Sequence, residues 1–358
     1  MQKSRYIPRS EDLTKLDSLI NDLNSNRCVA FVGAGVSVNK GYRAWKNLIY
    51  DQAKDVSLKG LLETAGISFK EVGHLKTYSQ IMDYCKDKME PTDFINFLKT
   101  EYSRKSSEIS ENHSLICKTN FKHIITTNFD PCLYDNAESL VPDLKTFGAN
   151  PLEFNEVRTL FQLHGRAYAI ESEDDSRLNN LIGGLVFGEK SFLEAYFEGF
   201  EISSFLYRIM QRFKLVFIGY SMNDEVFNQA TTAITKAYTK FLKDFIKMNS
   251  LSDVNPTIGF VLLAYPSEAF EKLKSKDSNL DENEKNKLVQ QIELFQNEVK
   301  RIEEMRLQVI GYDKFDKNFS GLTAVLQLIK NSAAMASLSK PFETPDATIT
   351  ASISGSAI

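Results

Sequence analysis

The chain has 358 residues with 43 basic and 47 acidic side chains, which gives a formal net charge of −4 with neutral histidines. This length allows one large domain or two modest ones, and there is no basic excess to neutralise nucleic-acid phosphates. The sequence has no apolar run long enough to cross a membrane, no signal-peptide core near its start and no C-x-x-C pair among its four cysteines. We therefore expect a reduced, cytoplasmic protein that binds neither nucleic acid nor membrane.

Short apolar runs predict the strands. In chain order they lie at 28–32, 124–125, 160–163, 215–218, 258–264 and 307–310. Because these runs do not alternate with polar residues, they are typical of parallel strands that are buried on both faces. Amphipathic spacing predicts helices between or beside them, at 45–56, 191–213, 225–248 and 282–305. The alternation predicts an α/β fold, with a Rossmann-like open parallel sheet flanked by helices.

Two segments fall outside this alternation. Residues 57–120 contain no good strand and predict an inserted helical layer. Residues 336–358 are rich in Ser, Ala and Thr with few apolar anchors, which predicts a mobile C-terminal tail. Residues 1–335 would then form one domain that carries the insert.

A glycine-rich segment, Gly-Ala-Gly-Val-Ser at 33–37, follows the first predicted strand. Glycines allow the backbone to approach a pyrophosphate closely, and the following helix offers N–H groups. A tight turn without a ligand explains the same residues equally well. Val38 stands where a dinucleotide fingerprint has its third glycine, and Lys40 is not followed by the Ser or Thr of a P-loop.

Polar side chains follow three other predicted strands. Asn128 and Asp130 provide a carboxamide and a carboxylate, although Asp130 could also form an Asx turn that caps the next helix. His164 provides an imidazole that can take a proton near neutral pH, although a single histidine is more often structural. Gly219 and Ser221 suit a ribose or phosphate contact. Because ligands bind beyond the carboxyl ends of parallel strands, we expect these residues to lie together.

The ordered set G-A-G-x-S, T-x-N-x-D, H-G and G-x-S resembles the sirtuin-like superfamily over roughly residues 25–330. The resemblance implies that 1–335 is an NAD+-binding catalytic domain with Asn128 and His164 as its catalytic pair. It further implies that NAD+ is held by Gly33, Ala34, Gly35, Ser37, Asp130, Gly219 and Ser221.

Two departures separate the chain from the deacylase branch of that superfamily. Residues 165–214 contain no cysteine where deacylases insert a four-cysteine zinc ribbon, so no metal is expected. Residues 41–46, Gly-Tyr-Arg-Ala-Trp-Lys, lack the acidic residue of the deacylase pattern G-I-P-D-F-R. The chain is more similar to the NADase effectors of bacterial antiviral defence, which deplete NAD+ in abortive infection by cleaving it to ADP-ribose and nicotinamide.

That similarity implies a separate sensor or activator, such as a HerA-type ATPase, a short Argonaute or a nucleotide-processing partner. The aromatic-rich helices predicted at 191–213 and 225–248 also suggest a homo-oligomer, although ordinary core packing would explain them equally well. Two alternatives remain open. The chain could be a non-catalytic module that binds NAD+ or ADP-ribose and regulates a partner, or a sirtuin-type deacylase.

Overall fold

The computed structural model describes residues 10–42, 66–68, 71, 78–103, 105, 110–140, 145–147, 157–171, 184–220, 225–248, 257–275, 280–313 and 320–338. These residues contain a seven-stranded sheet in the order β3-β4-β2-β1-β5-β6-β7, and every pairing in it is parallel. The strands are β1 (Cys28–Val32), β2 (Ile124–Thr126), β3 (Lys145–Phe147), β4 (Thr159–Gln162), β5 (Lys214–Ile218), β6 (Gly259–Tyr265) and β7 (Leu307–Asp313).

When the edge strand β3 is left out and the other six strands are renumbered in chain order, their order in the sheet is 3-2-1-4-5-6. This is the strand order of a Rossmann fold. This confirms the predicted open parallel α/β architecture. All six predicted strands are present. The sequence analysis missed β3 because its three residues, Lys-Thr-Phe, contain no apolar run.

Alternate residues of each strand face opposite sides of the sheet, which is why the strand sequences are continuously apolar. On β1, the side chains of Cys28, Ala30 and Val32 join one buried cluster, while those of Val29 and Phe31 join another. The first cluster lies under α1 (Ser10–Asn24), α7 (Glu111–Lys118), α8 (Cys132–Leu140) and α15 (Ser320–Leu338). The second lies under α11 (Glu201–Arg212), α12 (Glu225–Met248) and α14 (Glu282–Glu304).

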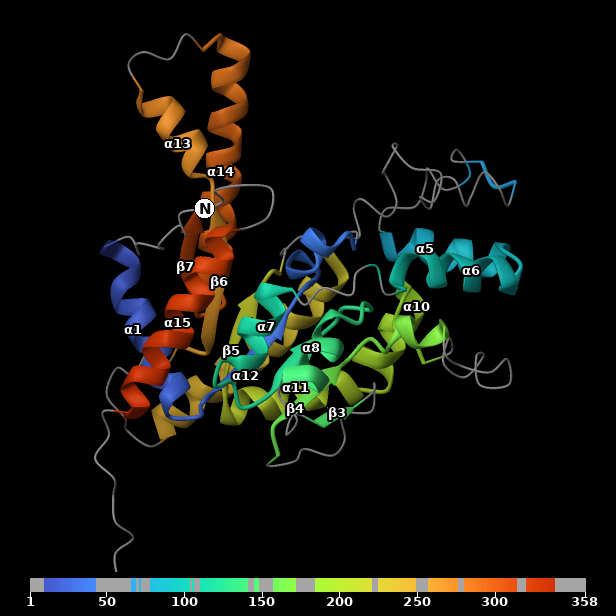
Figure 1. Cartoon of the computed structure of the whole chain (residues 1–358), viewed down its shortest axis with the longest axis horizontal. Helices are drawn as coiled ribbons and strands as arrows, with labels where there is room; N and C mark the ends of the chain where they lie inside the picture. Colours follow the sequence, from blue (N-terminus) through green and yellow to red (C-terminus); the bar gives the residue numbers. More distant parts are fainter. Residues whose placement is uncertain are drawn as a thin grey trace, which may run out of the picture.

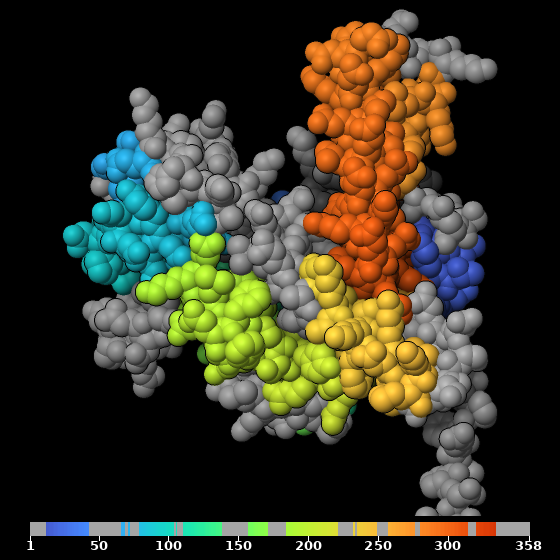
Figure 2. All heavy atoms as spheres, turned by 180° about the vertical axis from the view of Figure 1, so that it is seen from behind, coloured from blue at the N-terminus to red at the C-terminus, as the bar shows by residue number. Residues whose placement is uncertain are grey.

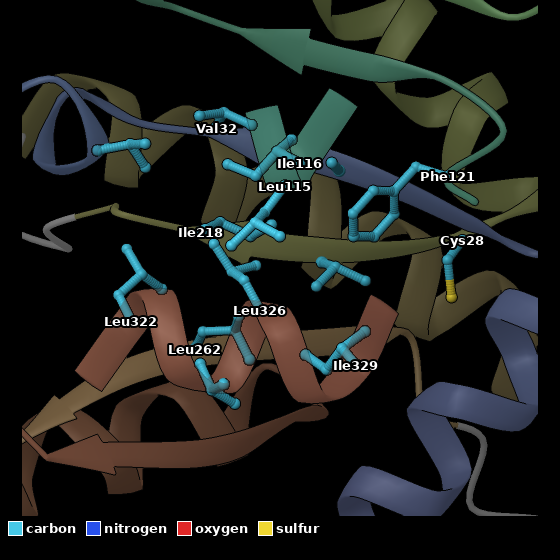
Figure 3. Close-up of a cluster of buried hydrophobic side chains, with 14 of the residues drawn as sticks. Cys28, Val32, Leu115, Ile116, Phe121, Ile218, Leu262, Leu322, Leu326 and Ile329 are labelled. Carbon is cyan, nitrogen blue, oxygen red and sulfur yellow. The ribbon is translucent and has the colours of Figure 1, made fainter. Parts of the chain in front are cut away.

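Helix α15 covers the middle of the sheet on the first face. Figure 3 shows Leu322, Leu326 and Ile329 of this helix directed toward Ile218 and Leu262 of the central strands. All five side chains are buried. The helix extends to Leu338, so residues 336–338 of the predicted tail are helical, and residues 339–358 lie outside the described part.

The region 57–120 contributes helices to two different places. Helices α5 (Tyr78–Lys88) and α6 (Pro91–Tyr102) lie at the side of the molecule next to α10 (Glu189–Leu193) (Figures 1 and 2). Their buried apolar side chains form a separate cluster that also includes Phe129 and Phe187. Helix α7 instead packs in the main core, where Leu115 and Ile116 are buried against the sheet. Within the described residues, the separate helical layer is therefore made by α5 and α6.

The helix predicted at 191–213 is interrupted. It consists of α10, one π-helical turn η4 (Glu194–Glu198) and α11, and Phe200 precedes α11 with a left-handed backbone (φ 56°). The predicted helices α12 and α14 are confirmed, and the one at 45–56 lies outside the described residues. Helix α14 projects from the body together with α13 (Ser267–Lys274) (Figures 1 and 2). In the described part of the chain, none of the helices combines the length and apolar character that crossing a membrane requires.

Candidate functional site

Four adjacent strands bring the predicted site residues to one edge of the sheet. Strands β4, β2, β1 and β5 are neighbours in that order, so the residues that follow their carboxyl ends lie side by side. These residues include His164, Asn128, Gly33 and Gly219. The strand order reverses between β1 and β5, which is the point where open α/β sheets bind ligands. Of the predicted residues, Ser221 lies outside the described part.

The glycine-rich loop after β1 is bonded to the end of β5. The Gly33 N–H donates to the Ile218 carbonyl at 2.9 Å, and the Gly35 N–H donates to the Gly219 carbonyl at 2.8 Å. A Cβ atom on Gly35 would lie 2.6 Å from that Gly219 oxygen, a distance too short for any side chain. The glycines are therefore required for this close contact between two loops, as in the tight-turn alternative.

Most backbone N–H groups of the same loop already donate to a carbonyl, so few of them can donate to a phosphate. The N–H groups of Val36 and Ser37 donate within the loop, to the carbonyls of Gly33 and Ala34 at 3.3 and 2.9 Å. Within the described residues, the Ala34 N–H has no partner. Pyrophosphate binding by this loop stays a prediction, and Ala34 is the residue whose amide is placed to contribute to it.

Ser37 is the centre of a buried polar network. Its hydroxyl lies 3.1 Å from His113 Nε2 and accepts a hydrogen bond of 3.4 Å from Asn128 Nδ2. It also forms a hydrogen bond with the Asp130 carboxylate. Ser37 and His113 are fully buried, and burial lowers the pKa of His113 to about 3. The Ser37 side chain thus connects the loop after β1 to the loop after β2.

The Asn128 side chain is held by the end of β1. Its Nδ2 also donates to the Gly33 carbonyl at 3.2 Å, and its backbone N–H donates to Thr126 Oγ1 at 3.0 Å. Thr126 Oγ1 in turn donates to the Val32 carbonyl at 2.8 Å. These bonds fix the carboxamide beside the glycine-rich loop, where its predicted catalytic role would require it.

Asp130 forms the Asx turn that the sequence allowed. Its Oδ1 accepts a hydrogen bond of 3.0 Å from the backbone N–H of Cys132, the first residue of α8. The carboxyl group is buried, and desolvation raises its pKa above the ordinary value. The Asp130 side chain thus already caps the start of α8. Its contact to nicotinamide stays a prediction.

His164 lies in an aromatic environment. Its Nε2 and the hydroxyl of Tyr196 share a hydrogen bond of 3.0 Å, and the rings of Phe129 and Phe192 lie with centroids 6.1 Å away. Burial lowers the pKa of His164 to about 3. The imidazole is therefore neutral at physiological pH, and one of its two nitrogens carries a lone pair that can accept a proton.

Two of these residues were not predicted. Neither His113 nor Tyr196 is among the residues that the sequence predicts for the site. Each lies far along the chain from its partner. His113 is 76 residues from Ser37, and Tyr196 is 32 residues from His164. Local spacing carries no signal for such pairs.

One group in the described part of the chain could hold a metal ion. The donor atoms of His113, Asp130 and Cys132 all lie within 4.8 Å of one another. Three donors are one fewer than a closed structural zinc site uses. Burial and the Asp130 charge also raise the pKa of the Cys132 thiol, which disfavours the thiolate that would bind a metal. The expectation of no metal stays a prediction.

Residues 122–281 match the sequence profile of the SIR2-like domain family. The matched segment contains Asn128, Asp130, His164 and the glycine turn after β5, and it begins after the glycine-rich loop. The similarity of this segment to SIR2-like domains suggests an NAD-related activity. No curated protein matches the chain at a significant level.

Proposed function

We propose that the chain is an NAD+ glycohydrolase that cleaves NAD+ to ADP-ribose and nicotinamide. The observation that carries this proposal is the position of Asn128 and His164. They follow the neighbouring strands β2 and β4, and a buried, neutral imidazole lies within the SIR2-like segment. A carboxamide and an uncharged base at adjacent strand ends suit the activation of water beside a sugar carbon.

The reaction balances with these residues alone. The bond between ribose C1′ and the nicotinamide nitrogen breaks, and its electron pair leaves with nicotinamide, which neutralises the pyridinium charge. The oxygen of water bonds to C1′, and one of the two water protons passes to His164. Asn128 orients the water or a ribose hydroxyl for this step. A positioned general base contributes about 10²–10⁴-fold to rate.

Hydrolysis is favoured over deacylation by the sequence that follows His164. Residues 165–214 contain no cysteine, so the zinc ribbon of the deacylases is missing there. The described residues of that region include α10, η4 and α11, and Tyr196 of η4 bonds to His164. Water is then the nucleophile that attacks the ribose carbon in this chain.

The biological role that fits this activity is an NAD-depleting effector of a bacterial anti-phage system. Support for this role comes from the resemblance of the motifs to defence NADases. We further propose that the chain forms a homo-oligomer and responds to a separate sensor, such as a HerA-type ATPase, a short Argonaute or a nucleotide-processing partner. Helix α12 exposes Phe241, Phe245 and Met248, which supports an assembly surface.

A second candidate is a regulatory module that binds NAD+ or ADP-ribose without cleaving it. The observation that favours it is the low pKa of His164, because a group with a pKa of about 3 is a weak base at neutral pH. In that case His164 would shape the pocket, and its removal would weaken binding without changing any reaction.

Nicotinamide release from NAD+, followed by chromatography, tests the proposal. We expect His164→Ala and Asn128→Ala to lose at least about 10²-fold in turnover. Asn120→Ala is the matched control, because Asn120 is exposed and its side chain bonds to Leu23 and Asn26, away from the site. Cleavage at the wild-type rate by both site variants would refute the mechanism.

If the isolated wild-type protein is inactive, the same assay is made on cells that co-express the neighbouring genes, with and without phage. Loss of NAD+ in those cells, absent with His164→Ala, supports the hydrolase. Tight NAD+ binding with no loss under either condition supports the binding module.

A further inference from the structure

We propose that Tyr196 is a positioning residue for His164, which sets the orientation and the tautomer of the imidazole. This inference rests on the proposed function, in which His164 is the base. The two side chains come from different elements, the end of β4 and the π-helical turn η4, and both are buried. Their hydrogen bond, of 3.0 Å between His164 Nε2 and the Tyr196 hydroxyl, joins them at the catalytic end of the sheet.

Tyr196 is itself held firmly. Its ring stacks on Phe192 with centroids 4.1 Å apart and planes inclined by 9°. Its backbone carbonyl accepts a hydrogen bond from the hydroxyl of Ser203, in the first turn of α11. A tyrosine fixed on both its ring and its backbone offers its hydroxyl in one place, and so can impose one orientation on a partner.

The backbone around Tyr196 departs from a regular helix. The Gly199 N–H donates to the Glu194 carbonyl at 2.7 Å, the five-residue spacing of a π turn. Single π turns are frequent at functional sites. The turn ends at Glu198, and Phe200, which precedes α11, adopts φ 56° although it lacks glycine's freedom. Such strain persists only when the surrounding structure enforces it, and here it accompanies the turn that places Tyr196 against His164.

The bond has a direct consequence for proton transfer. A neutral imidazole carries one proton, on either Nδ1 or Nε2, and a phenol can donate or accept. Both tautomers can form the Tyr196 bond: Nε2–H donates to the phenol oxygen in one, and the phenol O–H donates to Nε2 in the other. The proposed role requires the first, because in that tautomer the lone pair that takes the proton is on Nδ1. When His164 takes a proton, the phenol oxygen can accept from Nε2–H and stabilise the imidazolium that forms.

The test is Tyr196→Phe, which removes the hydroxyl and keeps the ring that stacks on Phe192. The matched control is Tyr168→Phe, because Tyr168 is also buried and its hydroxyl donates to Gln162 Oε1 at 3.1 Å without contacting His164. For nicotinamide release we expect Tyr196→Phe to lower kcat by roughly tenfold with KM for NAD+ unchanged, the effect of one lost hydrogen bond. Tyr168→Phe should retain the wild-type kcat.

A second readout does not require activity. The chain has four histidines, so nuclear magnetic resonance of protein carrying isotope-labelled histidine resolves each ring, and His164→Ala identifies the His164 signals. In the wild type we expect the ring nitrogens of His164 to show one tautomer, and in Tyr196→Phe a mixture. A mixture in the wild type, or unchanged signals and kcat in Tyr196→Phe, would overturn the inference. A wild type that consumes no NAD+ either in isolation or in the co-expressing cells, but shows a single Tyr196-dependent tautomer, would reject the hydrolase and retain the positioning of His164 by Tyr196.

Discussion

The two buried histidines predict that the protein loses stability in mild acid. His113 and His164 have pKa values of about 3 in the folded chain because burial disfavours their charged forms. In the unfolded chain both would titrate near the ordinary value of about 6.5. Between those two values the unfolded state binds more protons than the folded state. Stability is therefore complete above about pH 6.5 and is lost as the pH falls toward 3.

The size of the loss follows from these pKa values. Between about pH 7 and about pH 5, each histidine lowers the free energy of unfolding by about 2 kcal/mol, and the pair by about 4 kcal/mol. At pH 5 the result hardly depends on the folded pKa, because any value below about 4 leaves the folded histidine neutral. Asp130 acts in the opposite direction, because its raised pKa favours the folded state when the pH falls.

Urea unfolding of the wild type and of His164→Gln at the two pH values measures this effect. The variant has no ionisable group at this position, so its loss should be smaller than that of the wild type by about 2 kcal/mol. His164 is the better choice than His113, because His113 shares Ser37 with Asp130 and the two titrations are connected. Equal losses in both proteins, or a His164 resonance that titrates near pH 6.5, would refute the buried, neutral base.

Three other substitutions test the packing that positions the site, each by the free energy of unfolding in urea. Gly35→Ala places a Cβ against the Gly219 carbonyl and should cost about 1–3 kcal/mol, so an unchanged value would contradict the close loop contact. Leu326→Ala empties a buried position between α15 and the sheet and should cost about 2–5 kcal/mol, against a much smaller effect for the exposed Leu294→Ala. Asp83→Ala removes the carboxylate that accepts a hydrogen bond of 2.8 Å from the Lys190 N–H at the start of α10. The substitution should lower the free energy of unfolding by about 1 kcal/mol and speed proteolysis of α5. Equal digestion rates would argue against that contact.

The strands could be predicted because burial on both faces leaves a continuous apolar run in the sequence. Where that signal is missing, prediction failed, as for the three residues of β3 at the sheet edge. The break between α10 and α11 was also missed, although Gly199 stands at the end of the π turn as a sequence signal for it. Apolar residues continue at helical spacing through the π turn, and the left-handed residue there is Phe200, where a glycine would have marked the end of a helix.

The location of the site could be predicted, and its internal bonding could not. Polar residues after strands predict which side chains reach the same edge of the sheet, and the structure places Asn128, Asp130 and His164 there. The sequence does not show that Ser37 turns toward His113 or that His164 bonds to Tyr196. Those pairs depend on how helices α7 and η4 pack against the sheet, which is decided by tertiary contacts.

The helical layer of α5 and α6 shares a core with the loop after β2, which carries Asn128 and Asp130. Phe129 stands between Asn128 and Asp130 in sequence, and its ring packs against Tyr102 of α6 at 5.3 Å and Phe187 at 5.0 Å between centroids. The same ring lies 6.1 Å from that of His164. Because such a core is close-packed, α6 cannot move away without leaving a cavity beside Phe129 or drawing it along. If the proposed activator bound the α5–α6 layer, it would act on packing that reaches Phe129 and the ring of His164.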